Sequence, residues 1–193
     1  MKNKFFNSHI FIIFFMFFSS ENFAKNPSNL ENIILAGGCF WGVEELFQNL
    51  DGVVETEVGY SGGFSENPTY ETVSTGLTGH AESVKITFNN SKTSLEKILK
   101  FFFAIHDPTQ LNRQQNDVGT QYRSAIFYFN EKQKHQAENI IKQAEELKIY
   151  KSKIQTEISP ALKFYKAEKY HQNYLKNNPD GYTCHYLRNE WKF

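Results

Sequence analysis

A cysteine beside two glycines and two large aromatic side chains is the feature of this sequence best suited to chemistry. The run 37–41 (Gly-Gly-Cys-Phe-Trp) follows a short apolar stretch, residues 33–36, and precedes apolar residues at helical spacing, namely Val43, Leu46, Phe47 and Leu50. This pattern predicts a buried strand, a tight turn and an amphipathic helix that begins near Cys39. The unpaired N–H groups and the positive dipole end of a helix N-terminus favour a thiolate. We therefore expect Cys39 to be a reactive nucleophile beside a hydrophobic wall formed by Phe40 and Trp41.

Three further loop regions carry polar side chains that no core position requires. They are residues 67–70, 79–82 and 116–122, and they contain Tyr70, Glu82, Asp117 and Tyr122. If the loops meet, the thiolate attacks, a carboxyl kept protonated by apolar burial donates a proton, and the phenols donate hydrogen bonds to an oxygen. Spacing alone leaves alternatives open. The two tyrosines could equally be ordinary residues of a sheet, and Glu82 could be a surface residue at a strand edge. Asp117 could be a turn residue whose side chain binds its own backbone.

The histidines suggest one competing chemistry and argue against another. A pairing of Cys39 with His80 or His171 would suit a thiol hydrolase, and this alternative stays open. The histidines of the main part of the chain have no metal-ligand spacing with one another or with a cysteine, so we expect no metal site; they are His80, His106, His135, His171 and His185.

Length and charge place the chain among single-domain globular proteins. It has 193 residues, a formal net charge of zero and an isoelectric point near 7, with charges of both signs mixed along its length. Nothing here favours a nucleic-acid partner.

The first 24 residues stand apart from the rest. Lys2 and Lys4 precede an apolar block, residues 10–18, and Ala24 closes the segment as a cleavage residue, although Asn22 is not the small residue that cleavage prefers. This layout predicts a secretory signal peptide over residues 1–24 and a catalytic domain over residues 25–193. The predicted location is periplasmic or secreted, or membrane-anchored if the segment is not cleaved.

The chain has two cysteines, Cys39 and Cys184. In an exported protein this number suggests a disulfide. A permanent bridge in a non-catalytic binding domain is one interpretation. Against it, a domain of this size needs no such bridge, and Cys39 has a reactive setting.

Periodicity predicts alternating strands and helices. Strands are expected over residues 33–36, 53–60, 82–88, 122–129 and 154–158, with a short extended piece at 70–73. Helices are expected after Cys39, after the capping-box run 93–96, over 131–147 and over 164–175. In the second strand, Val54, Thr56, Val58 and Tyr60 share one face. The order predicts an α+β two-layer sandwich with a mixed sheet, a ferredoxin-like core and extensions.

The chain from about residue 33 to about residue 188 resembles the A-class peptide methionine sulfoxide reductases, which act on the S epimer of the sulfoxide. Seven stretches match in order: Gly-Gly-Cys-Phe-Trp-Gly (37–42), Gly-Tyr-Ser-Gly-Gly (59–63), Asn-Pro-Thr-Tyr (67–70), Thr-Gly-His-Ala-Glu (78–82), His-Asp-Pro-Thr (106–109), Asn-Asp-Val-Gly-Thr-Gln-Tyr-Arg-Ser (116–124) and Ala-Glu-Lys-Tyr-His-Gln-Asn-Tyr-Leu (167–175).

The resemblance implies a role for each matching site residue. Cys39 attacks the sulfoxide sulfur, Glu82 protonates the departing oxygen, and Tyr70 and Tyr122 donate hydrogen bonds to that oxygen. For substrate binding, Phe40 and Trp41 enclose the S-methyl group, and Asp117 holds the substrate backbone or the pocket loop.

The resemblance also implies how the enzyme is recycled. The first half-reaction leaves a sulfenic acid on Cys39, which condenses with Cys184, and thioredoxin or a thioredoxin-like protein reduces the disulfide. The implied substrates are oxidised proteins and free methionine sulfoxide, with no prosthetic cofactor and a monomeric chain. For residues 185–193, the sequence itself gives no interpretation beyond a short tail.

Overall fold

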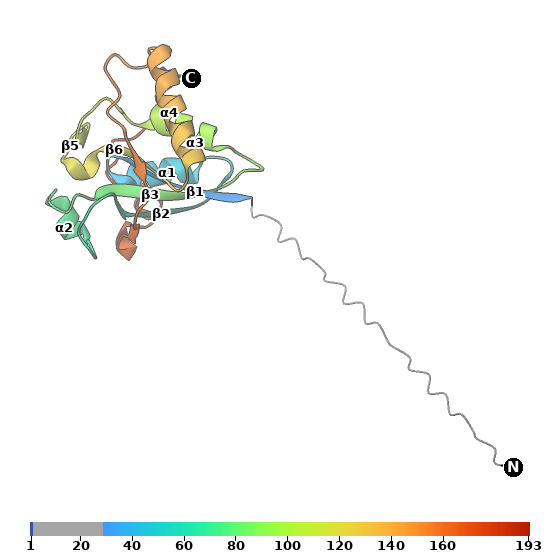
Figure 1. Ribbon diagram of the computed structural model, residues 1–193. Coiled ribbons are helices and arrows are strands. Elements are labelled where there is room, and N and C mark those ends of the chain that lie inside the picture. The colour runs from blue at the N-terminus through green and yellow to red at the C-terminus, as the bar shows by residue number, and fades with distance from the viewer. Residues whose placement is uncertain (2–28) are drawn as a thin grey trace.

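A six-stranded mixed sheet lies at the centre of the structure, with the strand order β7-β6-β1-β3-β2-β8 (Figure 1). The computed structural model describes residue 1 and residues 29–193. The strands of this sheet are β1 (Leu30–Gly37), β2 (Val53–Ser61), β3 (Ala81–Asn89), β6 (Ser124–Tyr128), β7 (Glu157–Pro160) and β8 (Tyr165–Lys166). The predicted signal segment, residues 1–24, lies outside the described residues apart from its first residue.

The helices and one small hairpin connect and cover these strands. The α-helices are α1 (Phe40–Gln48), α2 (Tyr70–Ser74), α3 (Leu95–Ile105), α4 (Glu131–Glu146) and α5 (Tyr174–Asn177), and two short 3₁₀ turns are η1 (Thr120–Tyr122) and η2 (Lys169–His171). The hairpin consists of β4 (Arg113–Gln114) and β5 (Asp117–Val118). In the described part of the chain, no helix is both long and apolar enough to cross a membrane.

The inner four strands have the ferredoxin-like arrangement. They run in the order β6-β1-β3-β2, every neighbouring pair is antiparallel, and the chain passes through them as β1-α1-β2-β3-α3-β6. Two edge strands extend this core, because β7 pairs parallel with β6 and β8 pairs antiparallel with β2. The predicted fold class, α+β with a mixed sheet, is confirmed.

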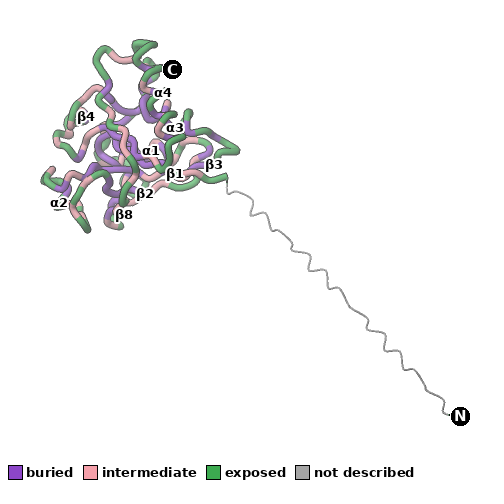
Figure 2. The backbone as a smooth tube through the Cα atoms, in the orientation of Figure 1, coloured by how far each residue is buried: buried purple, intermediate pink, exposed green. Residues whose placement is uncertain are grey.

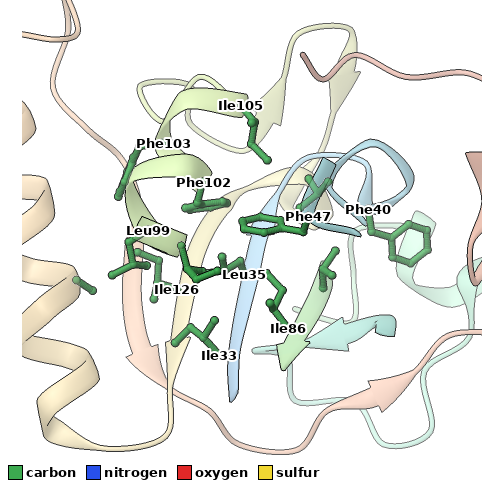
Figure 3. Packing of buried hydrophobic residues seen from close by; sticks show 14 of the residues in the cluster. Ile33, Leu35, Phe40, Phe47, Ile86, Leu99, Phe102, Phe103, Ile105 and Ile126 are labelled. Carbon is green, nitrogen blue, oxygen red and sulfur yellow. The ribbon is translucent and has the colours of Figure 1, made fainter. Parts of the chain in front are cut away.

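The main core lies between one face of the sheet and the helices. Ile33 and Leu35 of β1 point to this side, where they join buried residues of α1, α3 and α4, among them Phe47 and Phe102 (Figure 3). The intervening Ile34 and Ala36 face the other side, in a smaller cluster with Phe127 that Ala161 and Phe164 cover. Figure 2 shows this buried centre and the more exposed chain around it. The result is two layers, since successive strand side chains alternate between faces.

Two predicted segments adopt a different structure. Residues 70–73 were expected to be extended, but they form α2, because the side chain of Thr69 accepts from the Thr72 N–H while the Thr72 side chain accepts from the Thr69 N–H. Residues 164–175 were expected to be one helix, but they form β8, η2 and the start of α5. Pairing of Tyr165 and Lys166 with β2 takes the backbone of this segment into the sheet.

Smaller differences concern register and capping. The expected face of β2 is broken at Val54, which is 58% exposed, because the pairing with β3 shifts between Val53 and Glu55 and leaves an extra residue. The cap of α3 is Ser94, whose side chain accepts from the Lys97 N–H, so this helix begins one residue later than a cap at Thr93 would place it.

Candidate active site

Cys39 occupies the turn between β1 and α1, where it is the N-cap residue of the helix and is 7% exposed. The preceding Gly38 has φ +106°, and a Cβ atom there would lie 2.6 Å from Cβ of Gln114. Only glycine tolerates both this backbone conformation and this close approach. The glycine pair therefore lets the cysteine turn pack directly against the β4–β5 hairpin.

A small cavity of about 80 Å³ lies over this cysteine. It is lined by residues from all four loop regions and from the C-terminal segment: Cys39, Phe40, Trp41, Tyr70, Glu82, Asp117, Tyr122 and Tyr182. Seven of the eight site residues expected from the sequence thus line one cavity, and the eighth, Cys184, contacts Asp117 at its wall. A larger hollow of about 580 Å³ lies beside Tyr150 and Trp191, but no cysteine lines it.

Glu82 lies at the start of β3 and is 2% exposed. The pKa of its carboxyl is raised to about 8, chiefly by burial; the 3.0 Å hydrogen bond from the Phe40 backbone N–H opposes the shift, and the nearby Asp117 adds to it. The Glu82 carboxyl therefore keeps its proton at neutral pH and is able to donate it.

The two phenols also keep their protons. Burial is the first cause that raises the pKa of Tyr70 and of Tyr122, and the Glu82 carboxyl is the second. Each of them can therefore donate a hydrogen bond to an oxygen atom in the cavity.

The expectation that Cys39 is a thiolate is wrong for the protein without substrate. Burial raises the pKa of its thiol well above the ordinary value, and the Glu82 charge adds to the rise; the Trp41 backbone N–H lowers the pKa, but by less. The helix N-terminus thus acts in the predicted direction but is outweighed by desolvation. Cys39 is a neutral thiol in the resting site.

Tyr182, which lines the cavity, and Cys184, which does not, both contact Asp117. The Tyr182 hydroxyl donates to Oδ1 of Asp117 at 3.2 Å, and the Cys184 thiol lies 3.4 Å from Oδ2. Burial and the Asp117 charge raise the pKa of Cys184 to about 12. Both cysteines are free thiols here. Sequence reasoning missed Tyr182, although its place two residues before Cys184 was a usable signal.

The chain after Cys184 is also more than a tail. His185 is buried, with its Nε2 2.7 Å from the Gly37 carbonyl, and a Cβ atom on Gly42 would lie 2.4 Å from Oγ1 of Thr183. Arg188 is buried and donates to the Ile105 carbonyl at 2.6 Å. These contacts fix the C-terminal segment against α1 and the end of α3, correcting the expectation for residues 185–193.

The two histidines of the hydrolase alternative are engaged elsewhere. His80 Nδ1 accepts from the Gly63 N–H, and its Nε2 lies 2.8 Å from the Ser65 carbonyl. His171 Nδ1 accepts from the Trp41 indole N–H at 3.0 Å. No hydrogen bond joins either ring to Cys39 in the part of the chain that the structure describes. Among those same residues, no group of three or more His, Cys, Asp or Glu is arranged to hold a metal ion.

The site therefore defines a class of protein: a cysteine-based enzyme in which a thiol faces an acid and two phenols arranged to serve an oxygen atom. Comparison with known families makes this specific. The family model described as "Peptide methionine sulfoxide reductase" matches residues 31–192. The chain belongs to the peptide methionine sulfoxide reductase family.

Named relatives and solved structures agree with this assignment. The chain is 54% identical over 157 residues to peptide methionine sulfoxide reductase MsrA of Clostridium botulinum, an alignment that covers 81% of this chain and 98% of the relative. It is 48% identical to the MsrA of Nocardia farcinica, covering 82% of this chain and 91% of the relative.

Among solved structures, the reduced form of Mxr1 from Saccharomyces cerevisiae has a TM-score of 0.79 and 38% identity, covering 84% of this chain and 94% of that one. The complex of Mxr1 with Trx2 has a TM-score of 0.58 and 25% identity, and the match covers 87% of this chain and 96% of that one.

The protonation of Cys39 leads to a first prediction. In Cys184→Ser protein, the rate of alkylation of Cys39 by iodoacetamide should still rise with pH above pH 9, because the thiolate fraction is small until the pH approaches the thiol pKa. Glu82→Gln should shift this rise to lower pH by removing a neighbouring negative charge. Mass spectrometry across pH 6–10 measures both, with urea-unfolded protein as the reference. A rate that levels off below pH 7 would show the opposite, a depressed pKa.

Proposed function

We propose that this protein reduces the S epimer of methionine sulfoxide, in proteins and as the free amino acid, to methionine. The observation that carries the proposal is the meeting of Cys39, a protonated Glu82 and two phenols around one cavity, in a chain of the peptide methionine sulfoxide reductase family.

The first step begins from neutral groups. The sulfoxide oxygen accepts hydrogen bonds from Tyr70 and Tyr122 and takes the Glu82 proton, while the Cys39 sulfur bonds to the substrate sulfur and its own proton replaces that of Glu82. The hydroxyl group then passes from the substrate sulfur to the Cys39 sulfur: the bonds of the substrate sulfur to oxygen and to Cys39 both break, and a bond forms between oxygen and the Cys39 sulfur. A thiol and a sulfoxide thus give a sulfenic acid and a thioether, so the sulfoxide is reduced by two electrons and Cys39 is oxidised by two.

The substrate side chain is selected by the cavity walls. Phe40 is fully buried, and the Trp41 ring is held by the His171 hydrogen bond and by stacking on Tyr174, with ring centroids 3.8 Å apart. These rings supply the apolar surface for the S-methyl group, and the low polarity that they create helps keep Glu82 protonated. The proposed role of Asp117, which lines the cavity, is to hold the substrate backbone or the pocket loop.

In the second step, the Cys184 thiol attacks the sulfenic sulfur of Cys39. A disulfide forms and water leaves, with the Cys184 proton completing that water. What supports this role is the position of Cys184, whose thiol contacts Asp117 at the wall of the same cavity. The disulfide is then reduced by exchange with a dithiol protein, which becomes oxidised in turn.

Thioredoxin or a thioredoxin-like protein is the proposed donor. Support comes from the solved complex of Mxr1 with Trx2, to which this chain is similar in fold. The proposed working form is a monomer, because all residues assigned to the reaction come from one chain.

The proposed location is the periplasm or the extracellular space, with residues 1–24 as a signal peptide and residues 25–193 as the catalytic domain. The layout of charged, apolar and small residues at the N-terminus supports this proposal, and the family match begins at residue 31, beyond that segment. An exported enzyme needs an exported reductant, which makes a thioredoxin-like protein of that compartment the proposed partner.

The roles of the two cysteines can be separated by turnover number. Cys39→Ser should abolish reduction, because it removes the attacking sulfur. Cys184→Ser should still produce one methionine per enzyme and then stop when thioredoxin is the only reductant. Chromatography of methionine from the S-epimer substrate measures both variants. Full activity of Cys39→Ser would refute the mechanism, and sustained thioredoxin-driven turnover by Cys184→Ser would remove Cys184 from recycling.

The raised pKa of Glu82 sets a pH dependence for the first step. The pKa of about 8 lies above the ordinary value, so the carboxyl is protonated below pH 8 and ionised above it. The rate of methionine formation in a single turnover should be level from pH 6 to 7 and fall as pH rises through 8. Glu82→Gln should lower the rate by about 10²–10⁴-fold and abolish the fall. A rate that climbs steadily up to pH 8 would instead indicate attack by a pre-formed thiolate.

The location is tested by sequencing the mature protein. Expression in the native host, cell fractionation and N-terminal sequencing should give an exported protein that begins near Lys25. A cytoplasmic protein that still begins at residue 1 would contradict the signal-peptide proposal, and an uncleaved protein in the membrane fraction would show an anchor.

A further inference from the structure

Segment 167–175 matches a stretch of the family, and the role described for it so far is to hold the Trp41 ring through His171 and Tyr174. It does not line the cavity, yet its side chains contact two residues that do. His171 accepts from Trp41, and Glu168 accepts from the backbone of Tyr70. The Glu168 contact is the more informative, because Tyr70 serves the reacting oxygen directly.

Glu168 joins the central sheet to the short helix α2. Its Oε2 accepts from the Tyr60 hydroxyl at 2.8 Å, and its Oε1 accepts from the Tyr70 backbone N–H at 2.9 Å. Tyr60 lies on β2 and is fully buried. Tyr70 is the first residue of α2, a helix of five residues in which Val73 is the buried one.

The carboxylate suits this task because it is ionised. Burial alone would raise the pKa of Glu168, but hydrogen bonds from the Tyr70 N–H, its own backbone N–H and the Tyr60 hydroxyl, with the nearby His171, bring the pKa below its ordinary value. An anion at the first N–H of a helix also matches the helix dipole. The Tyr70 ring packs against the His171 ring, with centroids 4.5 Å apart, so the phenol is fixed on a second side.

We propose that Glu168 is a positioning residue for the reduction step: it ties the first residue of α2 to the central sheet and thereby holds the Tyr70 phenol against the sulfoxide oxygen. This inference rests on the proposed function. Glu168 touches no reacting atom, so it acts through Tyr70. Its loss should therefore slow the reduction of the sulfoxide, the step in which the Tyr70 phenol donates to the oxygen.

Double-mutant cycles test this path, with single-turnover methionine formation at saturating S-epimer substrate as the readout. Two phenols serve one oxygen, so Tyr122 masks part of any loss at Tyr70. Glu168→Ala should therefore slow methionine formation by about 10-fold alone and by about 100-fold in a Tyr122→Phe background, where Tyr70 is the remaining phenol. In a Tyr70→Phe background the same change should cost less than about threefold, because the group that it positions is gone.

Conservative variants separate positioning from loss of fold. Glu168→Gln can still accept from the Tyr70 N–H and can donate to the Tyr60 oxygen, so it should restore most of the rate. Tyr60→Phe keeps the core ring and removes the link between the carboxylate and the sheet, so in the Tyr122→Phe background it should slow the reaction several-fold. Glu146→Ala, an exposed glutamate on α4, is the matched control and should leave the rate unchanged.

Disulfide formation after the first turnover gives an independent readout. Cys184, Tyr182 and Asp117 have no hydrogen bond to Glu168 among the described residues, so Glu168→Ala should slow methionine formation far more than closure of the Cys39–Cys184 disulfide. Equal slowing of both steps would indicate a general structural defect and overturn the proposal. The proposal would also be overturned if adding Glu168→Ala to Tyr122→Phe changed the rate by less than twofold. The same holds if Glu168→Ala slowed methionine formation by an equal factor in all backgrounds. A wild-type protein that does not reduce the sulfoxide would instead refute the proposed function itself.

Discussion

The hydrogen bond from the Phe40 backbone N–H to the Glu82 carboxyl is the interaction on which the site depends. It joins the first residue of α1, which directly follows Cys39, to the start of β3, which carries the acid, across 42 residues of sequence. Both groups are buried, so a charge on either one raises the free energy of a charge on the other. The stable resting state is therefore doubly protonated, so that in the proposed step Glu82 can give its proton to the sulfoxide oxygen and regain one from Cys39. Packing of the glycine turn against the hairpin, and of the aromatic rings around the acid, maintains this low-polarity environment.

Much of the fold could be predicted because its core elements carry clear periodicity. The alternating residues of β3 and the apolar stripes of α1, α3 and α4 each indicate one type of element, and their order is enough to give the ferredoxin-like core. The predictions failed where local contacts or sheet pairing outweighed periodicity. Reciprocal side-chain caps at Thr69 and Thr72 produce α2 from a run that looks extended, and pairing with β2 takes residues 165–166 out of an apparent helix.

The sequence indicated the residues that carry the chemistry of the site. It did not indicate their protonation states or the residues that hold them in place. Glycine, aromatic and polar residues at loop positions marked Cys39, Glu82, Tyr70 and Tyr122. The protonation of Cys39 depends on how deeply the turn is buried, which the local sequence does not specify. The contacts of Glu168 with Tyr70 and of His185 with Gly37 span 98 and 148 residues, so they follow from the complete topology and not from any motif.

The absence of a side chain at Gly42 has a consequence for the surroundings of Cys184. The bare helix surface there lets Thr183 and His185 sit directly on α1, one residue on either side of Cys184. Cys184 therefore lies between two residues that pack against α1, the helix whose N-cap is Cys39. In the proposed recycling, the approach of Cys184 to Cys39 is therefore limited by the packing of Thr183 and His185 on this helix.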